Sequence, residues 1–271
     1  MKADPIVREV RSLLDRLAAS EGLPGSRRES VADDVAAKAR KLPRPGIVGI
    51  VDRAVGGSKA RRRQAVYVLS EVADTPEVAA RIGGWLADPD REWRSWLIQT
   101  VEQLGLRQYG VQLERIIRSD PDEVCRDFAI HAAGTLRAPE CLNSLLEMAE
   151  SQRHTHAVAW ALKDYATEAC RPHLRRYFQA TNDTSLRVVA AWGLAKLKEQ
   201  DALQYLVAML DDPDDRGPKH FTPGQSIRAA QAVSDVFGWP FQWNRAYVAK
   251  TKDRLARKHG AAEQGDEADE R

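Results

Sequence analysis

The stretch that decides the fold is RDFAIHAAGTL, residues 126–136, in which an arginine is followed by apolar residues three, four, seven and ten positions later. From Arg126 these positions hold Ala129, Ile130, Ala133 and Leu136. The spacing follows the 3.6-residue turn of an α-helix, so the apolar side chains share one face. The stretch therefore predicts an amphipathic helix whose apolar face needs a partner.

The same pattern recurs along the chain. The openings of its copies are Arg62 (RRQAVYVLSEV, 62–72), Arg94 (RSWLIQTVEQL, 94–104), Arg126, Thr155 and Arg187. Successive openings are separated by 32, 32, 29 and 32 residues, and a last copy near Arg228 is displaced by an insertion. Self-similarity at a period of this length indicates a repeat architecture.

The segments between these helices predict a second helix in each repeat. They end in turns such as DPD at 88–90 and at 120–122, where proline stops one helix and aspartate caps the next. A helix pair this short cannot bury its apolar stripe alone, so neighbouring pairs must stack. The pattern resembles the HEAT repeat over about residues 58 to 212, and it predicts an all-α superhelix, or solenoid, of about six to seven HEAT-like repeats.

The array defines the expected domain organisation. Residues 1–57 are expected to form N-terminal helices, near 4–20, 28–42 and 45–56, as a divergent capping repeat. Residues 58–259 form the array, with an inserted loop near 211–226 whose glycine and prolines interrupt any helix. Residues 260–271 hold five acids and one arginine without apolar periodicity, which favours a disordered acidic tail.

Composition limits the class of protein. Apolar residues make up 43% and charged residues 30% of the chain, as in ordinary globular proteins. There is no apolar run long enough for a membrane span and no apolar centre of a secretion signal near the start, so we expect a cytoplasmic protein. Cys125, Cys141 and Cys170 lack metal-ligand spacing and are expected to be reduced, buried thiols. The net charge is +2, and it is +6 without the acidic tail, a mild excess that permits contact with phosphate.

One helix carries a closer resemblance. THAVAWALKDYATEA, residues 155–169, resembles the signature helix of the HEAT-like DNA alkylation repair family, the alkylpurine DNA glycosylases, which carry A-x-x-W-x-L-[RK]-[DE]-Y-A. That run is 157–166 here. IIRSDPDEVCRDFAI, residues 116–130, resembles the Ser-Asp turn of the family and the arginine-opened helix that follows it. The resemblance extends over about residues 27 to 200.

The resemblance implies a site. Family members hold a damaged nucleotide with two tryptophans, an arginine and a catalytic aspartate, for which Trp93, Trp160 and Arg126 are the counterparts of the first three. The aspartate is expected four residues after the first tryptophan, where this chain has Leu97. Leucine cannot stabilise the positive charge that builds on the sugar when a glycosidic bond breaks. We therefore expect no cleavage of the family's kind, and no catalytic residue is assigned.

The predicted DNA-binding surface is the concave wall of the superhelix, where those positions are joined by arginines of the second helices, which are expected to line that wall. Its members are Trp93, Arg94, Arg115, Arg118, Arg126, Trp160, Lys163, Arg175 and Arg176. Structural alternatives stand beside this prediction. The arginines that open the repeats would also suit a ladder of bonds to acidic turns, the tryptophans would also suit the core, and the two alternative acids Asp88 and Asp90 would suit helix caps.

Three functions follow in order of preference. The first is a non-catalytic solenoid that binds duplex or damaged DNA through phosphate contacts, and the second is a protein-interaction scaffold without a nucleic-acid role. The third is an active alkylpurine DNA glycosylase. No cofactor is expected, and no metal site, because His154, His156, Cys170 and His173 do not complete a ligand set. The sequence does not indicate an oligomeric state.

Overall fold

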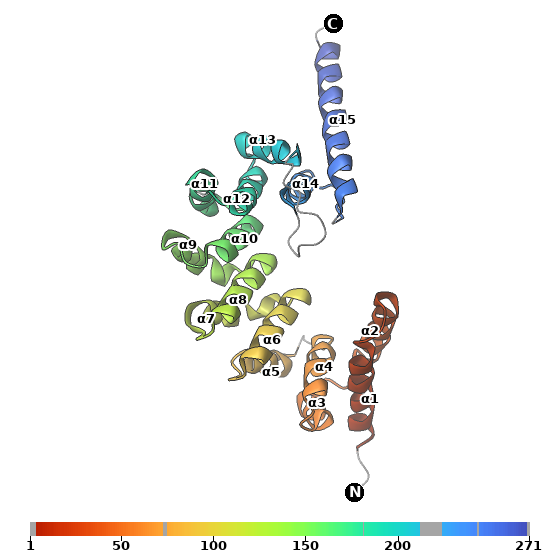
Figure 1. Cartoon of the computed structure of the whole chain (residues 1–271). Helices are drawn as coiled ribbons and strands as arrows, with labels where there is room; N and C mark the ends of the chain where they lie inside the picture. Colours follow the sequence, from red (N-terminus) through yellow and green to blue (C-terminus); the bar gives the residue numbers. More distant parts are fainter. Residues whose placement is uncertain (1–3, 73–74, 181, 212–223, 243, 270–271) are drawn as a thin grey trace. The chain divides into compact units, whose positions relative to one another are not determined.

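The computed structural model describes residues 4–72, 75–180, 182–211, 224–242 and 244–269. Among these residues there are fifteen α-helices, four short 3-10 helices and no strand (Figure 1). The prediction of an all-α solenoid is confirmed, and the helices pair as the repeat pattern requires.

The chain divides into two compact units, residues 1–112 (unit 1) and residues 113–271 (unit 2). The helices of unit 1 are α1 (Pro5–Ser20), α2 (Gly25–Ala39), α3 (Ile47–Val55), α4 (Lys59–Ser70), α5 (Pro76–Trp85), α6 (Arg91–Gln103), η1 (Arg107–Tyr109) and the start of α7 (Gly110–Ser119). The division lies inside the array predicted for residues 58–259, whose own boundaries stay predictions. The three N-terminal helices lie close to where the sequence predicts them.

Unit 2 continues the alternation of first and second helices. Its helices are α8 (Glu123–Leu136), η2 (Pro139–Cys141), α9 (Leu142–Glu150), α10 (Thr155–Tyr165), η3 (Glu168–Cys170), α11 (Arg171–Ala180), α12 (Thr184–Lys196), α13 (Gln200–Ala208), η4 (Met209–Asp211), α14 (Gln225–Val236) and α15 (Arg245–Asp269). Most of the predicted loop at 211–226 lies outside the described residues.

Helix α15 extends further than the sequence suggests. It runs to Asp269, through most of the segment for which we expected a disordered acidic tail. The segment contains no proline, and its alanines and glutamates have high helix propensity, so it can continue the helix that precedes it. The missing apolar periodicity of this segment does not exclude a helix.

The predicted turns are helix caps. The side chains of Asp90, Asp122 and Asp183 accept hydrogen bonds from backbone N–H groups in the first turns of α6, α8 and α12. Each satisfies donors that have no partner within the helix. The last aspartate of each turn thus sets where the first helix of a repeat begins.

The first helices of unit 2 pack in one row, in which α10 lies between α8 and α12, and α12 contacts α14. In Figure 1 this row lies on the inner side of the arc that unit 2 makes, and α7, α9 and α11 lie on its outer side. The row is tight because its contact positions are small. A Cβ on Gly134 of α8 would lie 2.5 Å from the Cα of Ala161 on α10, and one on Gly193 of α12 would lie 3.1 Å from the Cα of Lys163.

This close approach predicts a strong penalty for one added methyl group. Gly134→Ala should lower the free energy of unfolding by about 2 kcal/mol or more, because the backbones of α8 and α10 must move apart. Gly84→Ala in α5 is the control, since its Cβ would meet nothing within 4 Å. That change should be neutral or stabilise by about 0.5–1 kcal/mol, since alanine favours helix. Urea unfolding of both variants measures the difference, and an unchanged Gly134→Ala midpoint would contradict the packing described.

Candidate functional site

The signature helix α10 supplies a compact cluster of aromatic and cationic side chains. The ammonium group of Lys163 lies 4.6 Å from the ring centre of Trp160 and 4.1 Å from that of Trp192 on α12. The two indoles meet edge to face at 5.8 Å. The Lys163 side chain is only 6% exposed, and the carboxylate of Asp164 lies 2.6 Å from its ammonium group. The buried cation therefore contacts two aromatic rings and one carboxylate.

Further contacts bind this cluster to α14. The indole N–H of Trp192 donates to the carboxylate of Asp235 at 2.8 Å, and Lys196 lies 3.2 Å from the same carboxylate. The guanidinium of Arg228 lies 5.8 Å from the ring of Trp160 and bonds Ser185. Trp160 and Lys163 therefore join three first helices, and the burial of Lys163 leaves little of it for a ligand.

In unit 1 the two predicted site residues at the start of α6 are buried. Trp93 is 6% exposed, stacked on Trp96 at 5.1 Å and lying under the guanidinium of Arg62 at 4.4 Å. Arg94 is also 6% exposed and donates to the carbonyl oxygens of Asp88 and Pro89 at 2.8 and 3.0 Å. The half-exposed member of the indole stack is Trp96, which the sequence analysis did not select.

The position of the family aspartate is equally enclosed. Leu97 has no exposed surface. Of the alternative acids, Asp90 caps α6, while Asp88 pairs with Arg62 and accepts from the backbone N–H of Asp90 at 3.0 Å. Both acids therefore have structural partners. The predicted helix cap is confirmed for Asp90, whereas Asp88 bonds Arg62 and the turn and caps no helix. The pKa of Asp88 is lowered by its bonds to Arg62 and Asp90, which outweigh the opposing effect of burial.

The arginines that open the repeats form the predicted ladder. Arg94 and Arg126 donate to carbonyl oxygens of the turn that precedes their own helix, and Arg62 reaches Asp88 in the following turn. Such bonds from a cation to buried or half-buried oxygens hold the turn against the helix. This alternative is confirmed for these three residues.

The predicted arginines of the second helices are mostly paired as well. Arg118 pairs with Glu114 and Glu147, Arg175 with Glu199 and Asp201, and Arg176 with Glu150. These pairs join α7 to α9, α9 to α11 and α11 to α13. Arg115 is exposed on α7. In unit 2 these four arginines thus belong to the outer row of helices, whereas Arg126, Trp160 and Lys163 belong to the inner row, so the sequence-based placement of all of them on one wall is wrong.

The histidines act as partners for carboxylates. His154 lies 2.6 Å from Asp127, and His156 lies 3.0 Å from Asp183. Within the described parts of the chain, no group of three or more histidine, cysteine or acidic side chains could hold a metal ion. The three cysteines are buried and unbonded to one another, as predicted.

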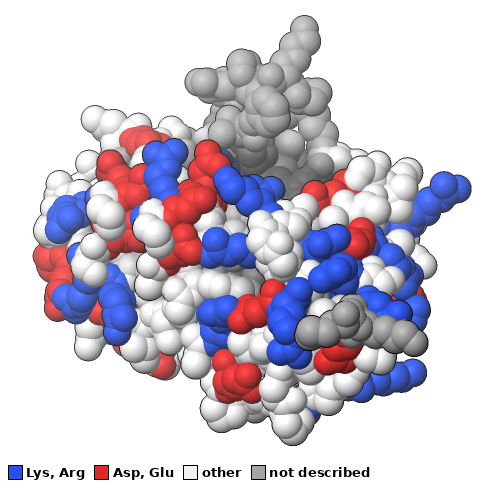
Figure 2. Space-filling view, turned by 90° about the horizontal axis from the view of Figure 1, so that it is seen from below, with Lys and Arg blue, Asp and Glu red and all other residues white. Residues whose placement is uncertain are grey.

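A run of positive charge in unit 1 lies outside the predicted DNA-binding surface. Residues 38–63 hold nine lysines and arginines and a single acid, Asp52. Lys41, Lys59 and Arg63 in this run are exposed and make no ion pair with another described residue. On the face of the molecule in Figure 2, blue side chains gather on the right half, in the part of the view that contains α1 and α3. A charge count in short windows reveals this run, which the near-neutral total conceals.

A comparison with known protein families identifies the repeats in the second half of the chain. Residues 111–194 and 138–220 match the family model for HEAT repeats. Together with the helix pairing, this match shows a solenoid of HEAT-like repeats. No curated protein matches the chain. Among the described residues, no helix combines the length and the apolar character that crossing a membrane requires.

The contacts of Arg94 predict a loss of stability when it is replaced. Arg94→Met should lower the free energy of unfolding by about 2 kcal/mol, because two half-buried carbonyl oxygens lose a charged donor. Arg115→Met removes the same charge from an exposed position and should change the free energy by no more than about 0.5 kcal/mol. Equal urea midpoints for the two variants would contradict a structural role for Arg94.

The buried lysine predicts a pH dependence. Burial, ahead of the opposing attraction of Asp164, lowers the pKa of Lys163 below its ordinary value of 10.5. As the pH rises from that lowered value to 10.5, the folded state releases the proton before the unfolded state does, so stability rises with pH. The free energy of unfolding of the wild type minus that of Lys163→Met should therefore increase as the pH approaches 10.5 from below. Urea titrations across this range measure it, and a constant difference would contradict the burial of a charged amine.

Proposed function

We propose that the protein is a non-catalytic HEAT-repeat scaffold that binds DNA through contacts with phosphates. HEAT repeats commonly mediate interactions between macromolecules, because stacked helix pairs present an extended surface. The proposal assigns that surface to a polyanionic partner.

One observation carries the choice of DNA. The nine basic residues and one acid of residues 38–63 give unit 1 a local positive charge far above the chain average. Three of these basic residues, Lys41, Lys59 and Arg63, are exposed and form no ion pair with another described residue. Arginines and lysines that neutralise phosphates supply most of the affinity of sequence-independent DNA binding. By contrast, the arginines that the family resemblance selected are largely committed to internal bonds.

Two features support a role without base cleavage. Leu97 is buried where the resemblance implies the catalytic acid, and Asp88 and Asp90 have structural partners. The relationship to alkylation repair glycosylases rests on the α10 run and the neighbouring turn. Trp93 and Lys163 are buried, so neither side chain is accessible to a nucleotide.

A protein-interaction scaffold is the second candidate. The observation that favours it is the mixed charge of the outer row in unit 2, where Glu147 and Glu150 remain about two-thirds exposed beside paired arginines. A surface of alternating charge suits a protein partner better than a phosphate backbone.

Salt dependence separates the two candidates. The affinity for a labelled DNA duplex of about 20 base pairs should fall steeply with salt, with a slope of log K against log salt of about −0.9 for each phosphate contact. Fluorescence polarisation between low and physiological salt measures the slope. Absence of binding at low salt would exclude the DNA proposal and leave the protein scaffold. Release of alkylated purine from damaged DNA would show that the protein is catalytic.

A further inference from the structure

The first half of α15 in unit 2 carries a second run of positive charge. Residues 245–258 hold six lysines and arginines and a single acid. The buried side chains of this half are Tyr247, Thr251 and Leu255, which recur every four residues and so share one face. That face packs against α14, where the hydroxyl of Thr251 lies 3.4 Å from that of Ser234. The helix is therefore attached to the array by one face, and its cations lie outside that face.

The turn before α15 brings two aromatic rings together. Gly238 follows the end of α14 with a φ of 66°, a left-handed conformation that glycine adopts without strain. Its backbone N–H donates to the carbonyl oxygen of Asp235 at 3.2 Å, and that of Trp239 donates to the carbonyl oxygen of Ser234 at 2.7 Å, which is the Schellman pattern. The turn brings Trp239 back onto Phe237, and the two half-buried rings stack at 4.8 Å.

Three cations of α15 lie over aromatic rings. They are four residues apart, share one side of the helix and are called the cation row here: Lys250, Arg254 and Lys258. The ammonium group of Lys258 lies 4.1 Å from the ring centre of Phe237, and the guanidinium of Arg254 lies 5.8 Å from that of Trp239. The ammonium group of Lys250 lies 4.6 Å from the ring centre of Tyr247.

A cation that contacts an aromatic ring keeps its charge. A carboxylate cancels the charge of the cation that it binds, whereas a ring attracts the cation through its quadrupole and carries no net charge. The cation row forms no ion pair with another described residue. Arg254 also donates to the carbonyl oxygen of Pro240 at 3.1 Å, which is a neutral acceptor. Internal contacts thus position these three side chains without neutralising them.

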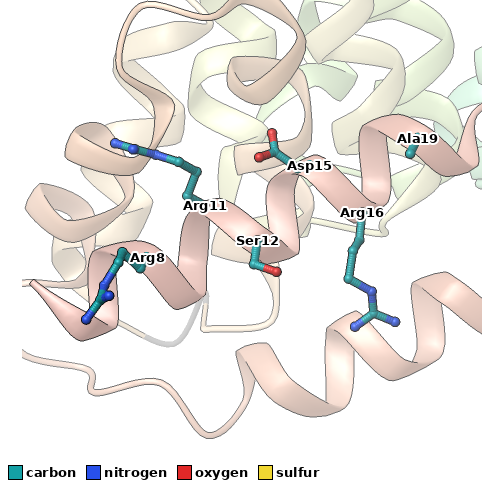
Figure 3. Close-up of a pocket in the computed structure, with 6 residues that line it drawn as sticks. All are labelled: Arg8, Arg11, Ser12, Asp15, Arg16 and Ala19. Carbon is teal, nitrogen blue, oxygen red and sulfur yellow. The ribbon is translucent and has the colours of Figure 1, made fainter. Parts of the chain in front are cut away.

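Other basic residues near grooves and helix junctions are bonded to carboxylates. Figure 3 shows Asp15 and Arg16 among the residues that line a groove over α1. Asp15 pairs with Arg61 at 2.6 Å, and Arg16 pairs with Asp34 at 2.6 Å. The charge at that groove is therefore largely balanced, in contrast to the cation row.

Few acids lie near the cation row. Asp253 is exposed on the same helix, and its carbonyl oxygen accepts from the exposed Arg257 at 3.2 Å. Asp235, at the end of α14, is bonded to Trp192 and Lys196. The acids at the end of the chain begin at residue 263, five residues or about 7 Å along the helix axis beyond the last member of the row. Positive charge therefore predominates along this side of α15.

The cation row also has the length of a short DNA backbone segment. From Lys250 to Lys258 the helix advances about 12 Å at about 1.5 Å per residue. One strand of a DNA duplex places a phosphate about every 3.4 Å along the axis, so the row spans about three phosphates. Cations that are positioned but not neutralised can replace the counterions of such a segment.

We propose that the cation row of α15 is a second surface on which this protein contacts the phosphate backbone of DNA, in addition to the basic run of unit 1. The inference rests on the proposed function and names a contact surface in unit 2. The rings of Phe237, Trp239 and Tyr247 position the cations, and the cations bind the phosphates.

The test compares two triple variants of the full chain that remove equal charge. Lys250→Gln with Arg254→Gln and Lys258→Gln should weaken binding to the DNA duplex about tenfold or more at low salt, and should reduce the salt slope by about 2 to 3. The control should weaken binding no more than about twofold to threefold, because only long-range attraction is lost. It replaces three exposed cations elsewhere in unit 2: Arg115→Gln, Arg153→Gln and Lys198→Gln.

The outcomes separate the inference from the proposed function. Equal losses in the two triple variants would overturn the assignment to α15 while leaving DNA binding intact. Binding that is lost in Lys41→Gln with Lys59→Gln and Arg63→Gln, but is unchanged in the α15 variant, would overturn it as well. A wild-type protein that binds no DNA would remove the proposed function and the inference with it.

Two milder variants guard against a loss of folding. Lys250→Gln with Lys258→Gln leaves the bond from Arg254 to Pro240 in place and should weaken binding about threefold to tenfold, with an unchanged urea midpoint. Lys250→Arg with Lys258→Arg should retain wild-type binding, since the charge is kept. If a polyglutamate peptide binds as tightly as DNA does, with the same dependence on Lys250 and Lys258, the partner is an acidic protein and the nucleic-acid assignment is wrong.

Discussion

The structure of unit 2 depends on how closely its first helices approach one another. Gly134 brings α8 onto the backbone of α10, and Gly193 brings α12 onto α10 at Lys163. Neither position leaves room for an added Cβ, so glycine is the residue that fits at both contacts. That separation also fixes where Trp160, Lys163 and Trp192 meet, because the indoles and the amine come from helices whose distance is set by these small residues.

In the repeats, arginine side chains mainly bond turns to helices and helices to one another. Side chains such as Arg94 and Arg126 bond the carbonyl oxygens of their own turns, and Arg118 and Arg175 bridge successive second helices through glutamates. A solenoid has no long-range contacts to hold its ends, so each junction between repeats must be stabilised locally. An arginine that is already paired at a junction is less available to a binding partner. The number of arginines alone therefore says little about binding.

The residues selected by the family resemblance are mostly not available to a ligand. The α10 run is present, but Trp93 and Lys163 are buried, and Leu97 is enclosed where an acid would be needed. The residues that the resemblance to the alkylation repair family selected take part in contacts within and between the repeats. In unit 1, the exposed basic side chains Lys41, Lys59 and Arg63 form no ion pair with another described residue. We therefore base the functional proposal on the basic run of residues 38–63 and not on the motif.

The sequence by itself determined the helices, their pairing into repeats and the caps that start them. Apolar spacing within a helix and the Asp-Pro turns are interactions between residues a few positions apart, so they are visible in the order of the amino acids. The burial of Trp93 beneath Arg62, the pairing of Arg175 with Glu199 and the isolation of Arg63 were decided only by the tertiary structure. Each depends on which side chain of a neighbouring helix pair, such as Arg62 for Trp93 or Glu199 for Arg175, reaches the same point in space. The sequence could show how many charges the protein carries, but only the packing of the repeats decided which of them remain available.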